Sequence, residues 1–463
     1  MCDVEISPKK SKMCPSDQKI FTTAMIVPEA TCAHFVKRKK RLCKMTVSKG
    51  KQYCGEHEPP TTLDDGAHPK DSDRIPCPLD PKHTVYKRKL QKHLRICNAR
   101  QKEDIPAYSV KGINAGDTAL DHELEKSSHL KLSELDDAEF YRIIQKVEEL
   151  HAKYVEGNIQ TLECQHKSLD LELAKEEYGK ESRKHLLQTA ALLGILEQEQ
   201  QLCDDTSFIE FGAGKGQLAF YLAKTLEAKR NAHVVLLDRM SLRHKKDNKI
   251  EDKSLVHRIR VDIADFHMRQ LELLQSSKRL VALSKHLCGA ATDLTLRCIT
   301  QALNECSPNA GESKRFFPQT EFLMIALCCH HRCDWASFVG KEFFRSNAVS
   351  PRDFIVITKM VSWAICGTGM SRERRRMVSE QQKPLSTEEQ RDSVANQRLS
   401  LKERERIGFM CKRVLDYARL MYLREHHFEA YLQCYVGRDV TLENVCFIIY
   451  YRYQFTGNER CIS

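Results

Sequence analysis

The stretch SFIEFGAGKGQ, residues 207–217, decides the fold of this 463-residue chain. A short apolar run ends in Glu210 and then breaks at Gly212, Gly214 and Gly216. Glycine is needed where the backbone turns sharply after a strand and where a ligand touches the main chain. A dinucleotide fingerprint would carry its third glycine one position later, and a P-loop would end in Gly-Lys-Ser/Thr. An ordinary turn between a strand and a helix is the alternative, but the acid and the alternate glycines favour a site for S-adenosylmethionine.

Acidic residues follow two further apolar runs. HVVLLDR, residues 233–239, reads as a second buried strand that ends in Asp238. RIRVDIADF, residues 258–266, reads as a third strand that ends near Asp262 and Asp265. Ligands of open α/β sheets lie beyond the carboxyl ends of the strands, so Asp238 is expected to bind ribose hydroxyls and Asp262 or Asp265 the adenine amino group. Helix capping is the alternative for each acid, but three acids at successive strand ends favour a cofactor site.

Composition and charge narrow the class of protein. The length suits two to four domains, and no apolar run approaches the length of a membrane span. The amino terminus shows no apolar signal segment, so we expect a soluble intracellular protein of the nucleus or cytoplasm that does not bind membranes. Its 20 cysteines then read as metal ligands and buried thiols rather than disulfides. The net charge of +11 favours a polyanionic partner.

A first metal-ligand cluster lies near the amino terminus. Cys32 and Cys43 are followed by the close pair Cys54 and His57, with His34 as a competing ligand. Zinc takes four cysteine or histidine ligands in a tetrahedron, and a short polar segment can fold when the metal replaces a core. Four filled positions predict a structural site.

A second cluster follows within CPLDPKHTVYKRKLQKHLRIC, residues 77–97. Cys77 and His83 form one pair, and His93 and Cys97 are spaced as neighbours on one face of a helix. We expect a second structural zinc ion here. Lysine and arginine between the ligands suit phosphate contacts, so nucleic-acid binding is the favoured use and protein binding the next.

Composition shifts divide the chain into segments. Linkers are expected over 59–66 and 102–116, and the charged region 371–406 is left without an assignment. The expected parts are a flexible terminus (1–28), a first finger (29–60), a second finger (74–100), a helical or coiled-coil segment (131–201) and a cofactor domain (202–463).

The helical segment shows a seam of apolar residues. Phe140, Ile143, Val147, Leu150 and Tyr154 recur at alternating three- and four-residue spacing. This pattern predicts either a coiled coil, through which two copies could associate, or a helical extension packed on the cofactor domain. The second interpretation is favoured because the seam weakens further along the chain.

Two later apolar runs end in reactive side chains. Residues 280–294 (LVALSKHLCGAATDL) place Lys285, His286 and Cys288 at the end of a strand, where methyltransferases meet their substrate. Residues 322–335 (FLMIALCCHHRCDW) end in two cysteines, two histidines and a further cysteine. A metal is one reading of that cluster. A substrate pocket is favoured, because adjacent residues on a strand point to opposite faces and cannot all reach one ion.

The remaining chain is expected to complete the sheet. Residues 350–367 read as a core strand or as lining of the substrate cleft. Residues 408–428 have helical periodicity, and the apolar runs 429–436 and 443–451 read as a closing antiparallel hairpin. The prediction is a class I, Rossmann-like α/β domain with a seven-stranded sheet.

Four features together carry a family resemblance over most of the chain. They are the finger with three cysteines and one histidine, the CHHC finger similar to that of a minor-spliceosome protein, and the stretches SKHLCGAATDL and IALCCHHRCDW. With them the chain closely resembles eukaryotic tRNA 2′-O-methyltransferases that modify nucleotide four of the acceptor stem. The resemblance implies methyl transfer from S-adenosylmethionine to that ribose in a subset of tRNAs that includes those for glycine, proline and histidine. It also implies that both Cys/His sets bind zinc and that the glycine loop with Glu210 binds the cofactor.

Methyl transfer is a displacement at a sulfonium carbon, so positioning of the hydroxyl should dominate and a general base should help. The candidate bases are His330 and His331, with Lys285 as a base or as a positive group beside the developing alkoxide, and with His286 as a further alternative. Each of these side chains could instead orient phosphate or pack the pocket. Two other functions stay open: an RNA-binding or splicing-associated protein with a silent cofactor domain, and a methyltransferase acting on protein or a small molecule.

Overall fold

The computed structural model describes residues 31–36, 41–43, 47, 50, 52–54, 57, 74–97, 99, 105–117, 129–242, 245–304, 318–366 and 398–451. The predicted flexible terminus 1–28, the linker 59–66 and residues 371–397 of the charged region lie outside these residues. The chain divides into two compact units, residues 1–104 and 105–463. No helix within the described residues is long and apolar enough to cross a membrane.

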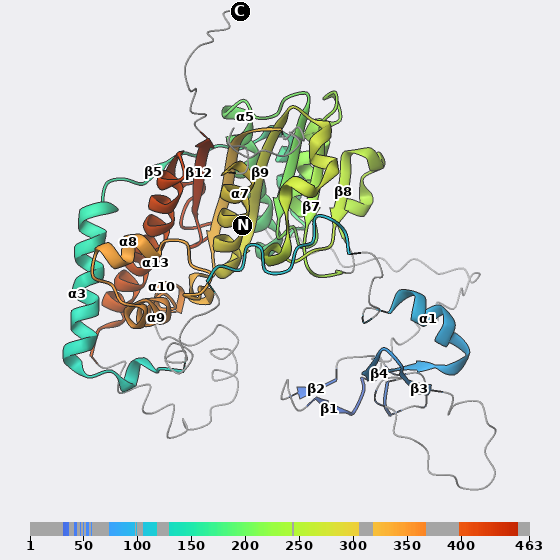
Figure 1. Cartoon of the computed structure of the whole chain (residues 1–463), viewed down its shortest axis with the longest axis horizontal. Coiled ribbons are helices and arrows are strands. Elements are labelled where there is room, and N and C mark those ends of the chain that lie inside the picture. The colour runs from blue at the N-terminus through green and yellow to red at the C-terminus, as the bar shows by residue number, and fades with distance from the viewer. Residues whose placement is uncertain are drawn as a thin grey trace, which may run out of the picture. The chain divides into compact units, whose positions relative to one another are not determined.

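The larger unit is built on one mixed sheet of eight strands (Figure 1). Its order is β5-β11-β12-β10-β9-β6-β7-β8, in which β12 runs antiparallel to its two neighbours and every other adjacent pair is parallel. The strands are β5 (Gln160–Thr161), β6 (Thr206–Phe211), β7 (His233–Leu237), β8 (Val256–Ile259), β9 (Arg279–Cys288), β10 (Gln319–Cys328), β11 (Phe428–Cys434) and β12 (Val445–Tyr451). The predicted α/β class and closing hairpin are confirmed, and β5 adds an eighth, two-residue strand at the edge.

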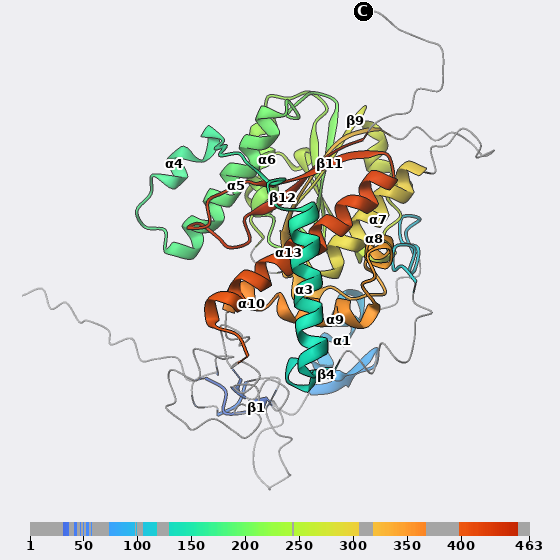
Figure 2. The same cartoon turned by 90° about the vertical axis from the view of Figure 1, so that its left-hand side faces the viewer.

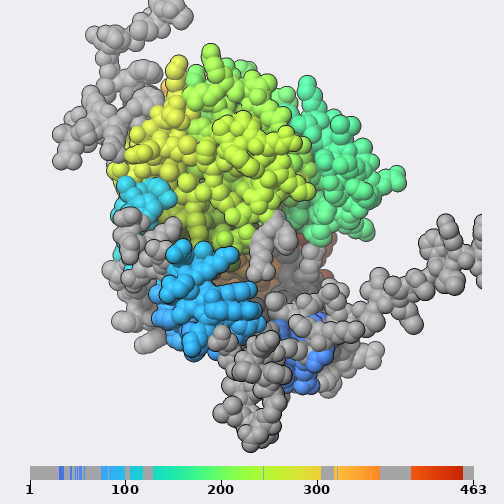
Figure 3. All heavy atoms as spheres, turned by 90° about the vertical axis from the view of Figure 1, so that its right-hand side faces the viewer, coloured from blue at the N-terminus to red at the C-terminus, as the bar shows by residue number. Residues whose placement is uncertain are grey.

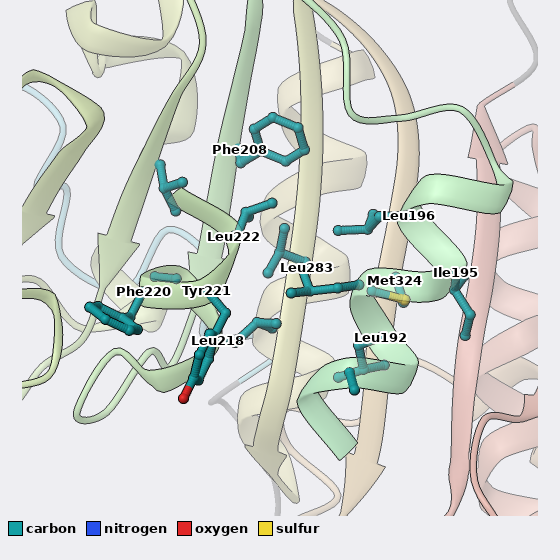
Figure 4. Packing of buried hydrophobic residues seen from close by; sticks show 14 of the residues in the cluster. Leu192, Ile195, Leu196, Phe208, Leu218, Phe220, Tyr221, Leu222, Leu283 and Met324 are labelled. Carbon is teal, nitrogen blue, oxygen red and sulfur yellow. The ribbon is translucent and has the colours of Figure 1, made fainter. Parts of the chain in front are cut away.

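Helices cover both faces of the sheet, which is why its central strands are apolar on both sides. On one face, Leu192 and Leu196 of α5 and Leu218 and Leu222 of α6 pack against Phe208 and other strand residues (Figure 4). Helices α7 and α13 supply residues to the cluster on the other face. These helices are α5 (Lys180–Gln198), α6 (Gln217–Leu226), α7 (Ala290–Asn304) and α13 (Leu401–Glu425).

The predicted helical segment is two helices rather than one. α3 (Asp137–Tyr154) and α5 are separated by residues 155–179, which contain β5 and the short helix α4 (Asp170–Leu173). The seam of α3 faces its own chain: Phe140, Ile143 and Val147 are buried with residues of α13 and α9 (Pro351–Met360). Figure 2 shows α3 (teal) beside α13 (orange-red).

The described part of this run, residues 350–366, forms two short helices, so the expectation of a core strand was wrong. Ser350 caps α9 by accepting a hydrogen bond from the Asp353 backbone amide, while Asp353 reciprocates at the Ser350 amide, and a proline occupies the first turn. This is a helix start signal that outweighs the β-branched residues of the run. The further short helices of this region are α8 (Lys341–Ser346) and α10 (Trp363–Cys366).

The second predicted linker is described over residues 105–116, and this part belongs to the larger unit. Ser109 forms a β-bridge with Phe266, and the Asn114 side chain donates to the carbonyls of Ile263 and Phe266 at 2.7 and 2.8 Å. The cyan atoms in Figure 3 show this segment on the surface of the unit. We call residues 105–117 the strap.

Candidate active site and metal clusters

The glycine loop joins β6 to α6 at the carboxyl edge of the sheet. Gly212, Gly214 and Gly216 all have positive φ angles, of 64°, 54° and 70°. A Cβ on Gly216 would lie 2.5 Å from a carboxylate oxygen of Asp247, whereas a Cβ on Gly214 would meet nothing closer than 3.9 Å. Gly216 is thus required by packing as well as by its backbone conformation, whereas the space beside Gly214 is open.

Glu210 ends β6 just before this loop. It is buried, and its Oε2 accepts a hydrogen bond from the Ala219 backbone amide in the first turn of α6 at 3.1 Å. Burial raises the pKa of Glu210 to about 8. The Glu210 carboxyl thus connects β6 to α6, and it is a group that can bind a proton next to the glycine loop.

An ion pair that the sequence patterns did not reveal braces the loop. Asp247 and Arg258 pair at 2.7 Å with both side chains largely buried, and Arg258 Nη1 donates to the Gly214 carbonyl at 3.0 Å. Arg258 lies on β8, so its hydrogen bond to Gly214 connects the glycine loop to that strand. An arginine within a strand was the available signal, but its partner, 11 residues earlier, had none.

Asp238, Asp262 and Asp265 accept hydrogen bonds from backbone amides. The third predicted strand is shorter than expected: β8 ends at Ile259, so Asp262 and Asp265 lie in the 3₁₀ segment after the strand and not at its end. Asp238 accepts from Gly214 at 2.8 Å and from Met240 at 2.8 Å, so it fixes the glycine loop to the end of β7. Asp262 caps a short 3₁₀ helix by accepting from Ala264 at 3.1 Å, which is the capping role weighed as the alternative. Asp265 accepts from Gly112 of the strap at 2.8 Å.

Lys285 lies on β9, the strand next to β6. Its side chain is buried, and its Nζ donates to the His185 carbonyl at 2.9 Å and to Thr189 Oγ1 at 3.0 Å, both on α5. Burial lowers the pKa of Lys285 to about 8, although the charge of Glu210 opposes this shift. An amine that titrates near neutrality can act as a base, which an ordinary lysine does not do.

A β-bulge positions the next residue. The parallel register of β9 and β10 shifts after Ser284, so that three steps along β9 match two along β10. The His286 ring lies 5.5 Å from the His185 ring, on the side where Lys285 meets α5, and the His286 side chain is exposed. Bulges often re-aim side chains in this way near active sites.

The two histidines after β10 have different surroundings. His330 is fully buried, and its Nε2 lies 2.6 Å from Asp416 Oδ1 on α13. Burial lowers the pKa of His330 and encloses the ring, which leaves it no exposed surface toward a substrate. This geometry speaks against His330 as the general base, whereas His331 is exposed. His330 and His331 are adjacent in the sequence and point to different surroundings, as expected.

Three cysteines at the ends of β9 and β10 do converge. The ligand atoms of Cys288, Cys328 and Cys329 all lie within 4.8 Å of one another. Hydrogen bonds from Cys328 and Cys329 lower the pKa of Cys288. The expectation that adjacent residues point to opposite faces was therefore wrong for Cys328 and Cys329. The strand β10 ends at Cys328, and the next residue, Cys329, has a left-handed backbone with φ 51°.

The smaller unit brings the eight predicted ligands together as two groups. Cys32, Cys43, Cys54 and His57 form one, with His57 Nδ1 at 3.4 Å from Cys54 Sγ and 3.6 Å from Cys32 Sγ. The competing His34 stacks on the His57 ring, with centroids 3.8 Å apart, and is outside the group. The strands beside this group are β1 (Phe35–Val36) and β2 (Arg41–Leu42).

Cys77, His83, His93 and Cys97 form the second group. The two sulfur atoms are 3.7 Å apart, His93 Nε2 is 3.2 Å from Cys77 Sγ, and His83 Nδ1 lies 3.3 Å from an Asp80 carboxylate oxygen. A carboxylate on the remote ring nitrogen orients a metal-binding histidine. The elements are β3 (Arg74–Cys77), β4 (Asp80–Tyr86) and α1 (Leu90–Ile96), after which Cys97 follows directly.

The glycine loop follows β6, and Lys285 lies near the carboxyl end of β9. These two neighbouring strands flank the point from which the sheet grows in opposite directions, to β7 and β8 on one side and to β10 on the other. Ligands of open α/β sheets bind in the crevice at such a point. The fold and this edge define a class I S-adenosylmethionine-dependent methyltransferase.

Comparison with known families identifies the chain more closely. A model described as "Methyltransferase TRM13" matches residues 187–450, "CCCH zinc finger in TRM13 protein" matches 30–58, and "U11-48K-like CHHC zinc finger" matches 74–98. The chain belongs to the TRM13 methyltransferase family, and its smaller unit carries the two zinc-finger modules.

Curated relatives match nearly end to end. The "tRNA:m(4)X modification enzyme TRM13 homolog" of Mus musculus is 34% identical over 90% of this chain and 93% of its own, and that of Homo sapiens is 34% identical over 90% and 94%. The TRM13 enzyme of Saccharomyces cerevisiae is 30% identical over 90% and 95%. Among solved structures, coclaurine N-methyltransferase matches with 13% identity and a TM-score of 0.25, covering 71% of this chain and 92% of its own, and adds nothing to the assignment.

Proposed function

We propose that this chain transfers a methyl group from S-adenosylmethionine to the ribose 2′-hydroxyl of nucleotide 4 in the acceptor stem of tRNA, with tRNAs for glycine, proline and histidine among its substrates. One observation carries the proposal: the open glycine loop of β6 and the Lys285–His286 bulge of β9 lie at the carboxyl ends of adjacent strands. Cofactor and acceptor would thus meet across that crevice. Membership of the TRM13 family supplies the tRNA as acceptor.

The cofactor would be held by the carboxyl edge of the sheet. The glycine loop would approach the ligand with its main chain, which is open at Gly214. Glu210 ends β6 just before the loop, and the positive charge of the cofactor would favour the ionised form of its carboxyl, whose pKa burial raises to about 8. Asp238 retains acceptor capacity for the ribose hydroxyls beyond its two backbone contacts, because a carboxylate has about four lone-pair sites. Asp262 or Asp265 would meet the adenine amino group.

Lys285 is the proposed base. A neutral amine has two N–H groups, which can serve the two acceptors on α5 and leave the lone pair for the hydroxyl proton. Protonated Lys285 could instead steady the developing alkoxide. His286 and His331 are the exposed alternatives at the same strand ends.

The fingers would bind zinc and contact RNA. Their four-ligand groups are closed sets of the kind that structural zinc ions occupy. In the second finger, the cationic groups of Arg74, Arg88 and Lys89 surround the Tyr86 ring at 4.6, 5.6 and 5.8 Å from its centroid. Exposed positive charge of this kind suits the phosphates of a duplex stem.

The cysteines outside the fingers are free thiols where described, in keeping with a reducing compartment such as the nucleus or cytoplasm.

The test is methylation of unmodified tRNA transcripts with labelled cofactor, followed by nuclease digestion and mass spectrometry. Label on nucleotide 4 of the glycine, proline and histidine tRNAs is the expected result. Cofactor binding with label on no tRNA would point to a protein or small-molecule acceptor. Absence of cofactor binding would favour an RNA-binding protein with a silent domain.

A further inference from the structure

Three thiols gather at the carboxyl ends of two central strands. Cys288 ends β9 and Cys328 ends β10, and the two residues are paired in the parallel ladder. Their sulfur atoms are 3.6 Å apart, and Cys329 brings a third sulfur within 4.8 Å of both. This trio, which we call the strand-end cluster, belongs to neither finger.

The spacing fits a tetrahedral metal. Zinc binds thiolate sulfur at about 2.3 Å, so two ligands of one tetrahedral ion lie roughly 3.8 Å apart. The Cys288–Cys328 distance of 3.6 Å is close to this value. It is also close to the 3.7 Å between Cys77 and Cys97, two ligand positions of the second finger in the same chain.

The backbone is arranged to bring the three side chains together. Consecutive residues of a strand point to opposite faces, but the left-handed conformation of Cys329 breaks this alternation directly after Cys328. A non-glycine residue in that conformation costs roughly 1–2 kcal/mol, so the surrounding structure must stabilise it.

The two loops that carry the cluster are also packed tightly. Gly289 follows Cys288 with φ 55°, and a Cβ at this position would lie 2.5 Å from the backbone of Arg332. The Gly289 amide faces the Cys328 carbonyl at 3.4 Å. The loop after β9 therefore cannot move away from the loop after β10 without losing these contacts.

We infer that the strand-end cluster binds a thiophilic divalent cation, Zn²⁺, through the three thiolates of Cys288, Cys328 and Cys329. Thiolate sulfur selects such ions over Mg²⁺ or Ca²⁺, which prefer oxygen. The described residues supply three ligands, which leaves the fourth position to water or another donor. Bound there, the ion would join the β9 and β10 loops at the substrate side of the sheet.

Zinc content of the full-length protein tests this site independently of methyl transfer. The variant with Cys288→Ser, Cys328→Ser and Cys329→Ser should contain one zinc ion per chain fewer than the wild type when both are purified under reducing conditions. Cys203→Ser, at a partly exposed thiol outside the three clusters, should match the wild type. Equal zinc in the triple variant and the wild type would overturn the inference.

A second measurement uses the unmodified protein, in case the triple variant does not fold. Native protein is alkylated before and after treatment with a strong chelator, and each cysteine is read by peptide mass spectrometry. Cys288 and Cys329, which are partly exposed, should react faster once the metal is removed, whereas Cys434, equally partly exposed, should react at one rate.

Unchanged reactivity of Cys288 and Cys329 on chelation would contradict a metal. So would a Cys288–Cys328 disulfide in the protein as isolated under non-reducing conditions, since it would consume two of the three thiolates.

Discussion

Gly214 and Gly216 share a left-handed backbone but differ in what surrounds them. Gly157 has the same conformation, with φ 76°, and stands in open space away from the site. Alanine at any of the three costs roughly 1–2 kcal/mol for the backbone alone. The comparison of the three variants therefore separates strain, packing and ligand approach.

Gly214→Ala is expected to lose about tenfold or more in affinity for S-adenosylmethionine while its stability matches that of Gly157→Ala, because only the ligand would meet the new methyl group. Gly216→Ala should lose stability as well, since its Cβ would collide with Asp247. Calorimetric titration and denaturant unfolding measure the two quantities. Unaltered cofactor affinity in Gly214→Ala would place the cofactor elsewhere.

If Lys285 is the general base, the reaction should depend on pH. The depressed pKa of Lys285 means that the amine loses its proton as pH rises through about 8, well before an ordinary lysine does. If neutral Lys285 accepts the hydroxyl proton, the single-turnover rate should rise through about pH 8 and then level. Lys285→Met should remove this rise, and Lys184→Met, a nearby change on α5, should keep it.

A rate that falls through the same range would instead assign Lys285 to the alkoxide. The folding linkage has a definite sign: the folded chain binds fewer protons between about pH 8 and 10.5, so the Lys285 contribution to stability becomes more favourable as pH rises through that window.

The sequence predicted those features whose residues lie close together along the chain. The acid and glycines after β6 lie within seven positions, and their spacing alone indicated a loop. The Asp247–Arg258 brace and the buried His330–Asp416 pair depend on which distant segments meet, 86 residues apart in the second case. No periodicity marks such partners in a single sequence.

At the scale of elements, α3 decides between two interpretations of the helical segment. Phe140 is 1% exposed, lies 6.2 Å from the Trp363 ring and is covered by the Arg398 guanidinium at 5.0 Å. These contacts are within one chain. The seam was visible in the sequence, but a heptad-like spacing does not say whether its partner is another copy or another helix of the same fold.

Phe140→Ala should cost about 3–5 kcal/mol of unfolding free energy, because it leaves a cavity between α3, α10 and α13. Leu171→Ala, at a side chain that is 84% exposed, should change the stability by no more than about 0.5 kcal/mol. Urea denaturation at two protein concentrations measures both. A midpoint that rises with concentration in the wild type, and no longer does so in Phe140→Ala, would contradict the intrachain role and support a coiled coil.

Residues 350–366 show a second limit at this scale, because a strand was expected where the structure has two helices. Their apolar residues are mixed with β-branched ones, which suggested a strand, while the capping box formed by Ser350 and Asp353 is a helix signal of only four residues. Where a short cap and a longer apolar run disagree, tertiary packing decides, and here the run is buried against α3 and α13.

For the molecule as a whole, the basic second finger is expected to raise affinity for tRNA without touching the chemistry. Lys89→Ala should weaken tRNA binding and reduce the slope of log K against log salt by roughly 0.7–0.9 if it contacts one phosphate. Lys153→Ala is the matched control, since Lys153 is also exposed and also lies over a tyrosine ring, at 4.8 Å. Filter binding at several salt concentrations gives both slopes.

Cofactor affinity should be the same in both variants. If the salt dependence of tRNA binding is identical for Lys89→Ala and Lys153→Ala, then the cationic groups around Tyr86 do not contact RNA, and the finger has a role in folding alone.

The proposed function requires one chemical event, attack on the cofactor methyl group by a ribose hydroxyl. The most direct measurement compares two glycine tRNA substrates that differ only at nucleotide 4, one carrying the 2′-hydroxyl and one a 2′-deoxyribose, each incubated with labelled S-adenosylmethionine. We predict stoichiometric label on the first and none on the second. Equal labelling of both would contradict the assignment of this family member as a methyltransferase of that hydroxyl.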